Sequence, residues 1–168
     1  MKALMTLDGS DNSASIVPTA KRLCELVPGL ELHILTVLDP KAVHGTAATA
    51  VGDPKGASAG TLVVHVPAPR VVESHGEAEE RLHRQSVADM ASLMEREFPN
   101  VDVSHHVIWS GQPADAIVTK ANEIDVDVIV MATHGRSGLS HLLAGSVAES
   151  VIRRSARPVL VRCPEVRP

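Results

Sequence analysis

Aromatic side chains are almost missing from this chain of 168 residues, which holds one tryptophan, one phenylalanine and no tyrosine. Flat platforms on which nucleic-acid bases stack are therefore scarce. A formal net charge of −4 also disfavours a polyanionic partner, whether nucleic acid or an anionic membrane surface. Because hydrophobic residues still make up 44% of the chain, we expect an aliphatic core and no nucleic-acid partner.

Cysteines and long apolar runs are also scarce. The two cysteines, Cys24 and Cys163, lack CxxC spacing, which is typical of reduced thiols in the cytosol. No stretch is apolar over the roughly 20 residues that a membrane-spanning helix needs. The start, MKALMTLDGS, has too short an apolar run for a signal peptide. We therefore expect a cytoplasmic protein without a membrane partner.

Three familiar site motifs are absent as well. The chain has no GxxxxGK[ST] phosphate loop, no GxGxxG dinucleotide fingerprint and no GxSxG nucleophile elbow. Phosphoryl transfer needs metal ligands and a group that positions the nucleophile, and no carboxylate motif accompanies Asp8. His44, His65 and His75 match no metal-site spacing. We predict no catalytic residues and no metal site.

What the sequence does contain is a regular alternation of short apolar runs and amphipathic segments. Strands are predicted at 3–7, 31–38, 101–109, 128–131 and 158–162, with helices from about 13, 77, 113 and 146. This order predicts one domain over 1–168 with a Rossmann-like, three-layer α/β/α fold. Its parts would be a five-stranded parallel sheet and four helices.

Residues 39–76 interrupt the alternation. The first part is rich in alanine, glycine and threonine and has no period, and a loop of this length is usually a lid or is disordered. Residues 61–66 form a β-prone run that Pro67 and Pro69 close. The run is open to three interpretations: an edge strand, a partner-binding segment, or part of a mobile flap. Of these three, we favour the flexible flap, which would cover a ligand pocket.

The most informative stretch is 126–151, VDVIVMATHGRSGLSHLLAGSVAESV. A buried strand ends in a glycine-bearing connector, and a helix opens at Ser146, which Glu149 completes as a capping box. The first N–H groups of a helix have no partner within it and form its positive end, while Gly135 and Gly145 let a ligand approach the backbone. This pattern is that of a phosphate cradle, although many similar loops bind nothing.

Asp8 follows the first strand, just as the connector follows the fourth. In open parallel sheets ligands bind beyond the carboxyl ends of the strands, where the strand order reverses. Asp8 would face the cradle if the first and fourth strands are neighbours. From the residues alone, a turn residue that bonds its own backbone is the better interpretation of Asp8.

The connector resembles a family signature. Ala132, two residues, Gly135, nine residues and then Gly145-Ser146 is similar to the nucleotide-binding signature of the universal stress protein family, with alanine where the first glycine stands. The resemblance covers most of the chain apart from the stretch after residue 39. It implies that Asp8 holds a nucleoside. The implied nucleotide site comprises Thr6, Leu7, Asp8, Val37, Met131, Ala132, His134, Gly135, Arg136, Gly145, Ser146, Val147 and Ala148.

The same resemblance implies a function. Members bind ATP or AMP, with or without Mg²⁺, and act as regulatory homodimers in stress responses. Dimers form through the last strand, here Pro158 to Arg162, which is a short apolar edge candidate that begins with proline. The alternatives are a dimeric partner-binding stress protein that no longer uses nucleotide, and a slow ATPase.

His105 and His106 lie next to each other in the predicted strand 101–109. Their side chains should point to opposite faces of the sheet, because successive residues of a strand alternate. Neither has a catalytic partner that the sequence reveals.

Overall fold

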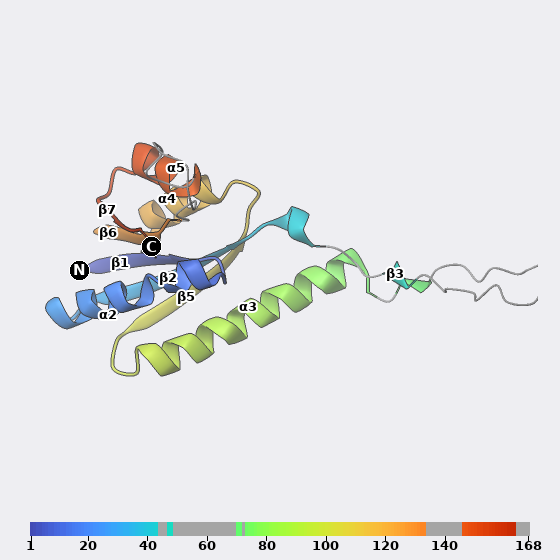
Figure 1. Ribbon diagram of the computed structural model, residues 1–168, viewed down its shortest axis with the longest axis horizontal. Helices are drawn as coiled ribbons and strands as arrows, with labels where there is room; N and C mark the ends of the chain where they lie inside the picture. Colours follow the sequence, from blue (N-terminus) through green and yellow to red (C-terminus); the bar gives the residue numbers. More distant parts are fainter. Residues whose placement is uncertain (44–46, 49–69, 72, 134–145, 164–168) are drawn as a thin grey trace, which may run out of the picture.

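A five-stranded parallel sheet forms the centre of the protein (Figure 1). The computed structural model describes residues 1–43, 47–48, 70–71, 73–133 and 146–163. The strand order is β5-β2-β1-β6-β7, and every neighbouring pair is parallel. The strands are β1 (Lys2–Leu7), β2 (Glu31–Leu38), β5 (Val103–Trp109), β6 (Val128–Ala132) and β7 (Val159–Arg162).

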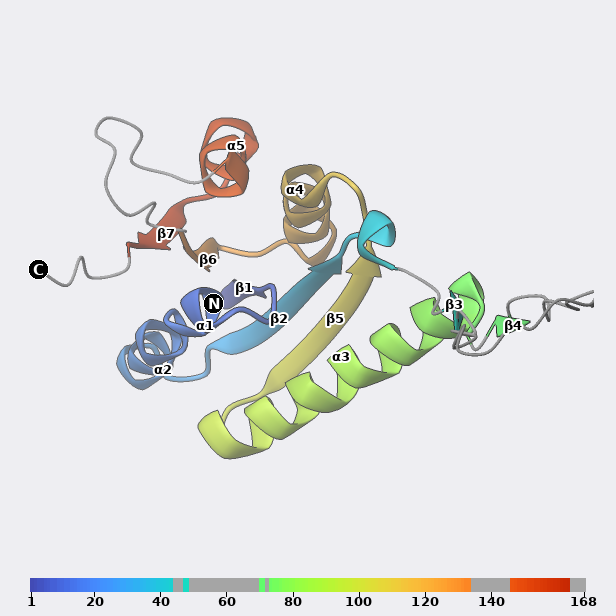
Figure 2. The ribbon, with the colours of Figure 1, turned by 45° about the vertical axis from the view of Figure 1, so that its right-hand side comes forward.

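Helices cover both faces of this sheet (Figure 2). One face packs against α2 and α3, and the other against α4 and α5. The predicted three-layer fold with five parallel strands and four covering helices is confirmed. The helices are α1 (Asp11–Ala14), α2 (Val17–Leu26), α3 (His75–Glu97), α4 (Pro113–Ile124) and α5 (Ser146–Arg154), with a short 3₁₀ turn η1 (Pro40–Ala42) after β2.

The core divides into two aliphatic clusters, one on each side of the sheet. Strand β1 supplies both, because Met5 faces α2 and α3 while Leu4 faces α4 and α5, and both side chains are fully buried. Fully burying a leucine or isoleucine side chain is worth roughly 1.5–3 kcal/mol. An aliphatic core therefore suffices despite the shortage of aromatic residues.

The first predicted helix is divided in two. The sequence predicts one helix from about Ser13, whereas α1 ends at Ala14 and α2 begins at Val17, with Pro18 in its first turn. The cause is the proline, which has no N–H for the carbonyl of Ala14 and whose ring would collide with that carbonyl. The break places α1 as a separate turn beside β6.

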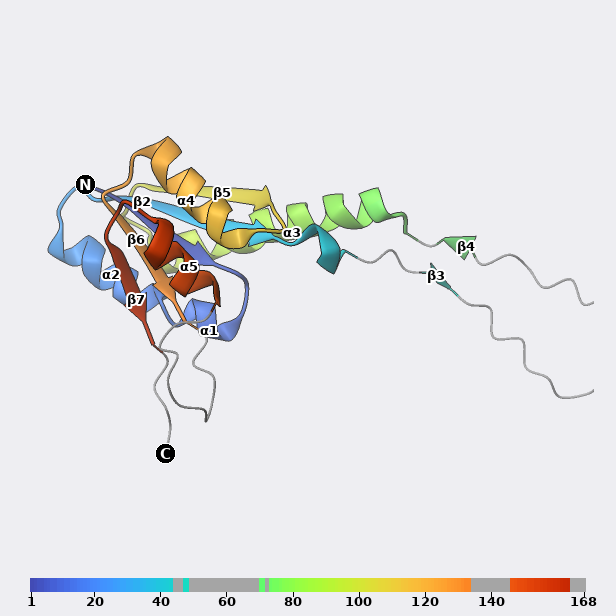
Figure 3. The same ribbon diagram turned by 90° about the horizontal axis from the view of Figure 1, so that it is seen from above.

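The stretch after β2 is described only in part. Strands β3 (Ala47–Ala48) and β4 (Arg70–Val71) pair antiparallel, and α3 begins at His75, two residues before the predicted start. Seen from above, α3 runs past the carboxyl end of the sheet toward these two strands (Figure 3). The β-prone run 61–66 lies outside the described residues. Within the described ranges, no helix has both the length and the apolar character needed to cross a bilayer.

Candidate functional site

The strand order reverses between β1 and β6. From β1 the chain moves to β2 on one side, and later returns to β6 on the other side. Met5 lies opposite Val130, so the predicted neighbourhood of the first and fourth strands is confirmed. Counting on along both strands, Asp8 is level with Thr133. This is the place in an open α/β sheet where ligands bind.

Asp8 organises the turn that leaves β1. Its Oδ1 accepts hydrogen bonds from the Ser10 backbone N–H at 2.9 Å and from the Ser10 hydroxyl at 2.6 Å. This is the self-bonding turn that the sequence predicts for aspartate. Gly9, between them, has a φ of +81°, a conformation that glycine adopts without strain. The turn leaves Asp8 exposed at the carboxyl end of β1.

Ser10 and Ser13 fix the turn to α1, although neither residue was predicted to belong to the site. The backbone N–H of Ser13 donates to Ser10 Oγ at 3.1 Å, as in an N-cap. The Ser13 hydroxyl donates to the Ser10 carbonyl at 2.9 Å, and its oxygen accepts from the Asp8 N–H at 3.2 Å. The available signal was Ser10 ahead of Asp11 and Asn12, an N-cap residue followed by an acidic first turn.

The other predicted residues on the strands are split between the two faces of the sheet. Val37 and Met131 belong to the side of α4 and α5, and Thr6 joins them because it alternates with Leu7. Leu7 and Ala132 belong to the side of α2 and α3. The structure therefore places all five near the carboxyl ends of β1, β2 and β6, on two sides of the sheet.

Ala132, which replaces the first glycine of the signature, ends β6 in extended conformation. It pairs with Arg162 of β7, and the next residue, Thr133, donates its backbone N–H to the Arg162 carbonyl at 2.9 Å. Among the described non-glycine residues only Asp125 has a positive φ. The methyl group of Ala132 therefore strains no backbone.

Helix α5 begins at Ser146, where the sequence predicts that a helix opens. Val147 is partly buried, and Ala148 is only 3% exposed because it packs in the core cluster with α4. The Ala148 side chain is thus a core contact. His134, Gly135, Arg136 and Gly145 lie outside the described residues.

No metal centre is formed by the described part of the chain, where no three histidine, cysteine, aspartate or glutamate side chains gather. The described portion of the switch point consists of backbone groups, the exposed Asp8 carboxylate, the hydroxyl groups of Thr6 and Thr133, and apolar side chains. Such a set can enclose a flat apolar ring and bond polar groups at its edge.

The chain is a doubly wound α/β protein whose strand order reverses between β1 and β6. The sequence model of the universal stress protein family matches residues 1–162. The chain therefore belongs to the universal stress protein family.

Two sequence relatives illustrate the extent of the match. Universal stress protein YxiE of Bacillus subtilis is 29% identical over 160 residues, which cover 95% of this chain and 97% of that protein. Universal stress protein MJ0577 of Methanocaldococcus jannaschii is 46% identical over 55 residues, but that match spans only 33% of this chain and 34% of the relative.

Solved structures match over nearly the whole chain. The structure of MJ0577 has a TM-score of 0.70 at 25% identity and covers 99% of this chain and 97% of its own. A universal stress protein in complex with cAMP has a TM-score of 0.57 at 21% identity, with 98% of each chain covered. One from Archaeoglobus fulgidus in complex with dAMP has a TM-score of 0.55 at 20% identity, with 96% of each covered. The last two likenesses show the fold.

Proposed function

We propose that this protein binds an adenine nucleotide, ATP or AMP, at the β1–β6 switch point and acts as a regulatory homodimer in a stress response. The observation that carries the proposal is the switch point itself, with Asp8 held at one side and the start of α5 following β6 at the other. Family membership supports it, and so do the two structural neighbours in complex with cAMP and dAMP, which are both adenine nucleotides.

Charge fixes the orientation of the nucleotide in this proposal. A carboxylate repels phosphate, so Asp8 takes the nucleoside end and accepts a hydrogen bond from a ribose hydroxyl. The positive N-terminus of α5 takes the phosphates, through the amides of Ser146 and Val147. Thr6, Leu7 and Val37 line the adenine end, and Arg136 meets the outer phosphates. Mg²⁺ would arrive with the phosphates of ATP, since the described residues offer it no cluster of ligands.

The test uses an isosteric change at Asp8. An asparagine side chain keeps an oxygen for the two bonds from Ser10 but loses the negative charge. Because hydrogen bonds to charged groups are about twice as strong as neutral ones, Asp8→Asn should weaken AMP binding about tenfold in calorimetric titration. The control is Asp11→Asn, which removes an equal charge from the exposed surface of α1 and should leave the affinity unchanged.

Wild-type affinity in a folded Asp8→Asn variant would show that Asp8 does not contact the nucleotide. Wild-type protein that binds neither ATP nor AMP would refute the proposed function as a whole, and would leave the partner-binding alternative. Multiple-turnover hydrolysis of ATP that Asp8→Ala abolishes would favour the slow ATPase.

The homodimer in the proposal would form along β7. This strand is the end of the sheet, and its Leu160 side chain is 41% exposed. Beside it, a groove of about 330 Å³ separates β7 from α2, where Leu26 is 62% exposed. An exposed apolar edge strand pairs readily with another chain. The groove is lined by Pro18, Thr19, Arg22, Leu23, Leu26, Leu160 and Arg162.

The proposal has two further parts. The cytoplasmic location agrees with Cys24 and Cys163, which are both free thiols. We also propose that residues 39–76 are a flap on a single domain. The described part of that stretch, η1 with β3 and β4, starts at the carboxyl end of β2, which is the end of the sheet where the nucleotide would lie.

A further inference from the structure

A pair of histidines joins the edge strand β5 to the interior of the sheet. His33 of β2 and His106 of β5 stack with ring centroids 5.5 Å apart and ring planes at 24°. The Nδ1 atom of His33 lies 3.3 Å from the Nε2 atom of His106, so the two nitrogens share one hydrogen. The rings lie on the face that α4 covers, next to the buried Leu35. Both histidines are half-buried.

The second nitrogen of His33 decides how the pair is protonated. Its Nε2 atom is buried and has no hydrogen-bond partner among the described residues. A buried N–H without an acceptor costs more than a buried lone pair without a donor. We therefore assign the shared hydrogen to His33 Nδ1, which donates to His106 Nε2, and the remaining hydrogen to His106 Nδ1. Both rings are then neutral, and His33 Nε2 carries only a lone pair.

The pair cannot be protonated without either burying an unpaired N–H group or breaking the hydrogen bond between the rings. While the bond between the rings persists, the first proton must go to His33 Nε2, where the new N–H is buried and unpaired. A second proton puts hydrogens on both facing nitrogens and breaks the bond between the rings. Each step also adds positive charge to a partly desolvated pair.

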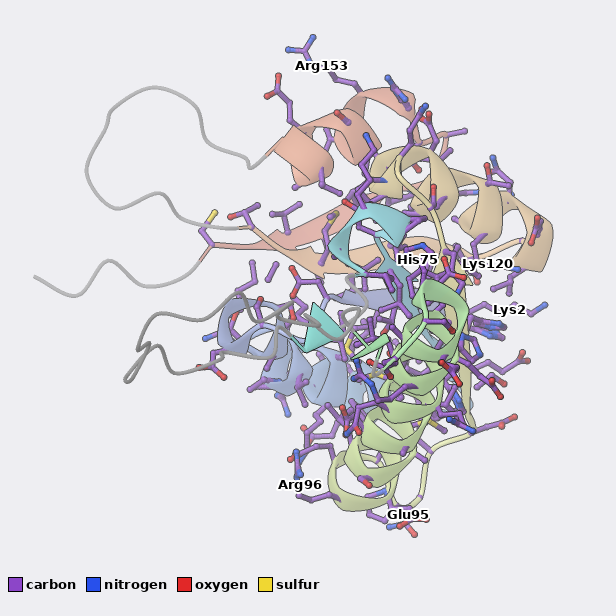
Figure 4. The ribbon with its side chains drawn as sticks, turned by 90° about the vertical axis from the view of Figure 1, so that its right-hand side faces the viewer. Lys2, His75, Glu95, Arg96, Lys120 and Arg153 are labelled. Carbon is purple, nitrogen blue, oxygen red and sulfur yellow. The ribbon has the colours of Figure 1, made fainter. Side chains whose placement is uncertain are left out.

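The charged groups around the pair come from several elements of the fold. On β1 and β2, Lys2 disfavours protonation of His33 and Glu31 favours it, as does Asp102 just before β5. On α4, Lys120 disfavours protonation of His106 and Glu123 favours it, while His105 on β5 disfavours it. Lys2 and Lys120 project from the same flank of the molecule (Figure 4). Lys120 and Glu123 also pair with each other at 2.6 Å, and of the two Lys120 has the larger effect on His106.

Burial sets the direction of both pKa values. It is the largest cause that lowers the pKa of His33, with Lys2 adding to it and Glu31 opposing it. Burial also lowers the pKa of His106, followed by the charges of Lys120 and His33. The unfolded chain therefore binds more protons than the folded one below about pH 6.5. The stability that the pair contributes is present above that pH and is lost as the pH falls toward the folded pKa values.

We propose that the His33–His106 pair is an acid-sensitive clasp that holds edge strand β5 to β2 at neutral pH and loosens it in mild acid. His33 lies near the amino end of β2 and His106 is level with Leu35, whereas Val37 and the proposed nucleotide site lie at the carboxyl end of the strand. It would let the protein respond to acidification independently of nucleotide.

The first test is urea unfolding at pH 7.5, 6.5 and 5.5, with a chelator present so that no metal bridges the rings. The wild-type urea midpoint should fall with pH, and the double variant His33→Gln/His106→Gln should lose at least half of that fall. The matched control, His105→Gln, changes the neighbouring histidine on the opposite face and should keep most of the fall. Equal falls in the wild type and in a folded double variant would overturn the clasp.

The second test needs no double variant. Ring-carbon NMR titration of the nine histidines should show two that titrate below the ordinary range. His33→Gln should remove one of these signals and raise the pKa of the other. Amide exchange, corrected for intrinsic rates, should lose more protection in β5 than in β6 between pH 7.5 and 5.5. Histidines that all titrate near 6.5, or equal loss of protection in β5 and β6, would each contradict the proposal.

Discussion

The turn after β1 depends on a few atoms of Asp8, Gly9 and Ser10. Gly9 has a φ of +81°, and a Cβ there would meet no atom within 4 Å. The cost of a side chain at this position is therefore conformational alone. We predict that Gly9→Ala lowers the free energy of unfolding by about 1–2 kcal/mol, measured by urea denaturation.

Gly111 supplies the control for that measurement. It also has open space around its Cα, but its φ is not positive. Gly111→Ala should leave stability within about 0.5 kcal/mol of the wild type or raise it slightly. Equal losses in the two variants would mean that the left-handed conformation of Gly9 is not what requires glycine.

Individual site residues could be predicted from the sequence to different degrees. The Asp8 turn follows from local chemistry, because aspartate bonds the backbone two residues on in any fold. The roles of Ser10 and Ser13 did not follow, because they depend on a helix of four residues that the longer pattern from Ser13 conceals. The stacking of His33 on His106 needed the β2–β5 register, which no local pattern contains.

Helix α3 has a capping box at its N-terminus, which stabilises the first turn of this long helix. Its residue Ser74 accepts a hydrogen bond from the Glu77 N–H at 3.3 Å, and Glu77 accepts one from the Ser74 N–H at 2.7 Å. These first turns extend past the carboxyl end of the sheet (Figure 3). We predict that Ser74→Ala costs about 1 kcal/mol in the free energy of unfolding. Ser92→Ala, at an exposed interior position of α3, should be neutral or stabilising.

The same capping box makes the stability of α3 depend on pH. The bond from the Ser74 backbone N–H is the largest cause that lowers the pKa of the Glu77 carboxyl. The contribution of Glu77 is therefore present above its unfolded pKa, near 4.5, and is lost as the pH falls through the lower folded value. A Ser74→Ala variant whose stability equals that of the wild type near neutral pH would show that the box does not hold the helix.

The elements were the most predictable level of the structure. Five apolar runs and the amphipathic segments between them determine the strands and helices with little reference to distant residues, and the parallel order follows from their alternation. The exception is the division of α1 from α2 at Pro18. There the predicted helix from about Ser13 to Val27 is interrupted between Ala14 and Val17, because Pro18 cannot continue the hydrogen bonding of α1.

The whole molecule has an exposed apolar edge that another copy would cover. Burial of Leu160 and Leu26 at a two-fold interface along β7 is the expected state, since both are exposed in the single chain. We predict that light scattering after size exclusion gives about twice the chain mass of 17.8 kDa, and that Leu160→Asp gives the monomer mass.

Ile152→Asp is the matched control for the dimer. Ile152 is 48% exposed on α5 but does not line the groove beside β7. This variant should keep the dimer mass. A monomeric wild type, or a dimer that persists in Leu160→Asp, would rule out β7 as the interface.

The arrangement of the whole molecule could be predicted from the sequence less fully than its helices and strands. Residues 39–76 lack a hydrophobic period, so no pattern specified what they pack against. The place of the proposed nucleotide site follows from the strand order, whereas the predicted residues His134, Gly135, Arg136 and Gly145 lie outside the described residues.

The most direct test of the account is calorimetric titration of the nucleotide-stripped protein with Mg-ATP and, separately, with AMP. The proposed site predicts saturable binding with a micromolar dissociation constant, about −8 kcal/mol, and binding of AMP as well as ATP, because Asp8 and the strand ends contact the nucleoside they share. No binding heat at two temperatures with either nucleotide would contradict the account and direct the search to protein partners of residues 39–76.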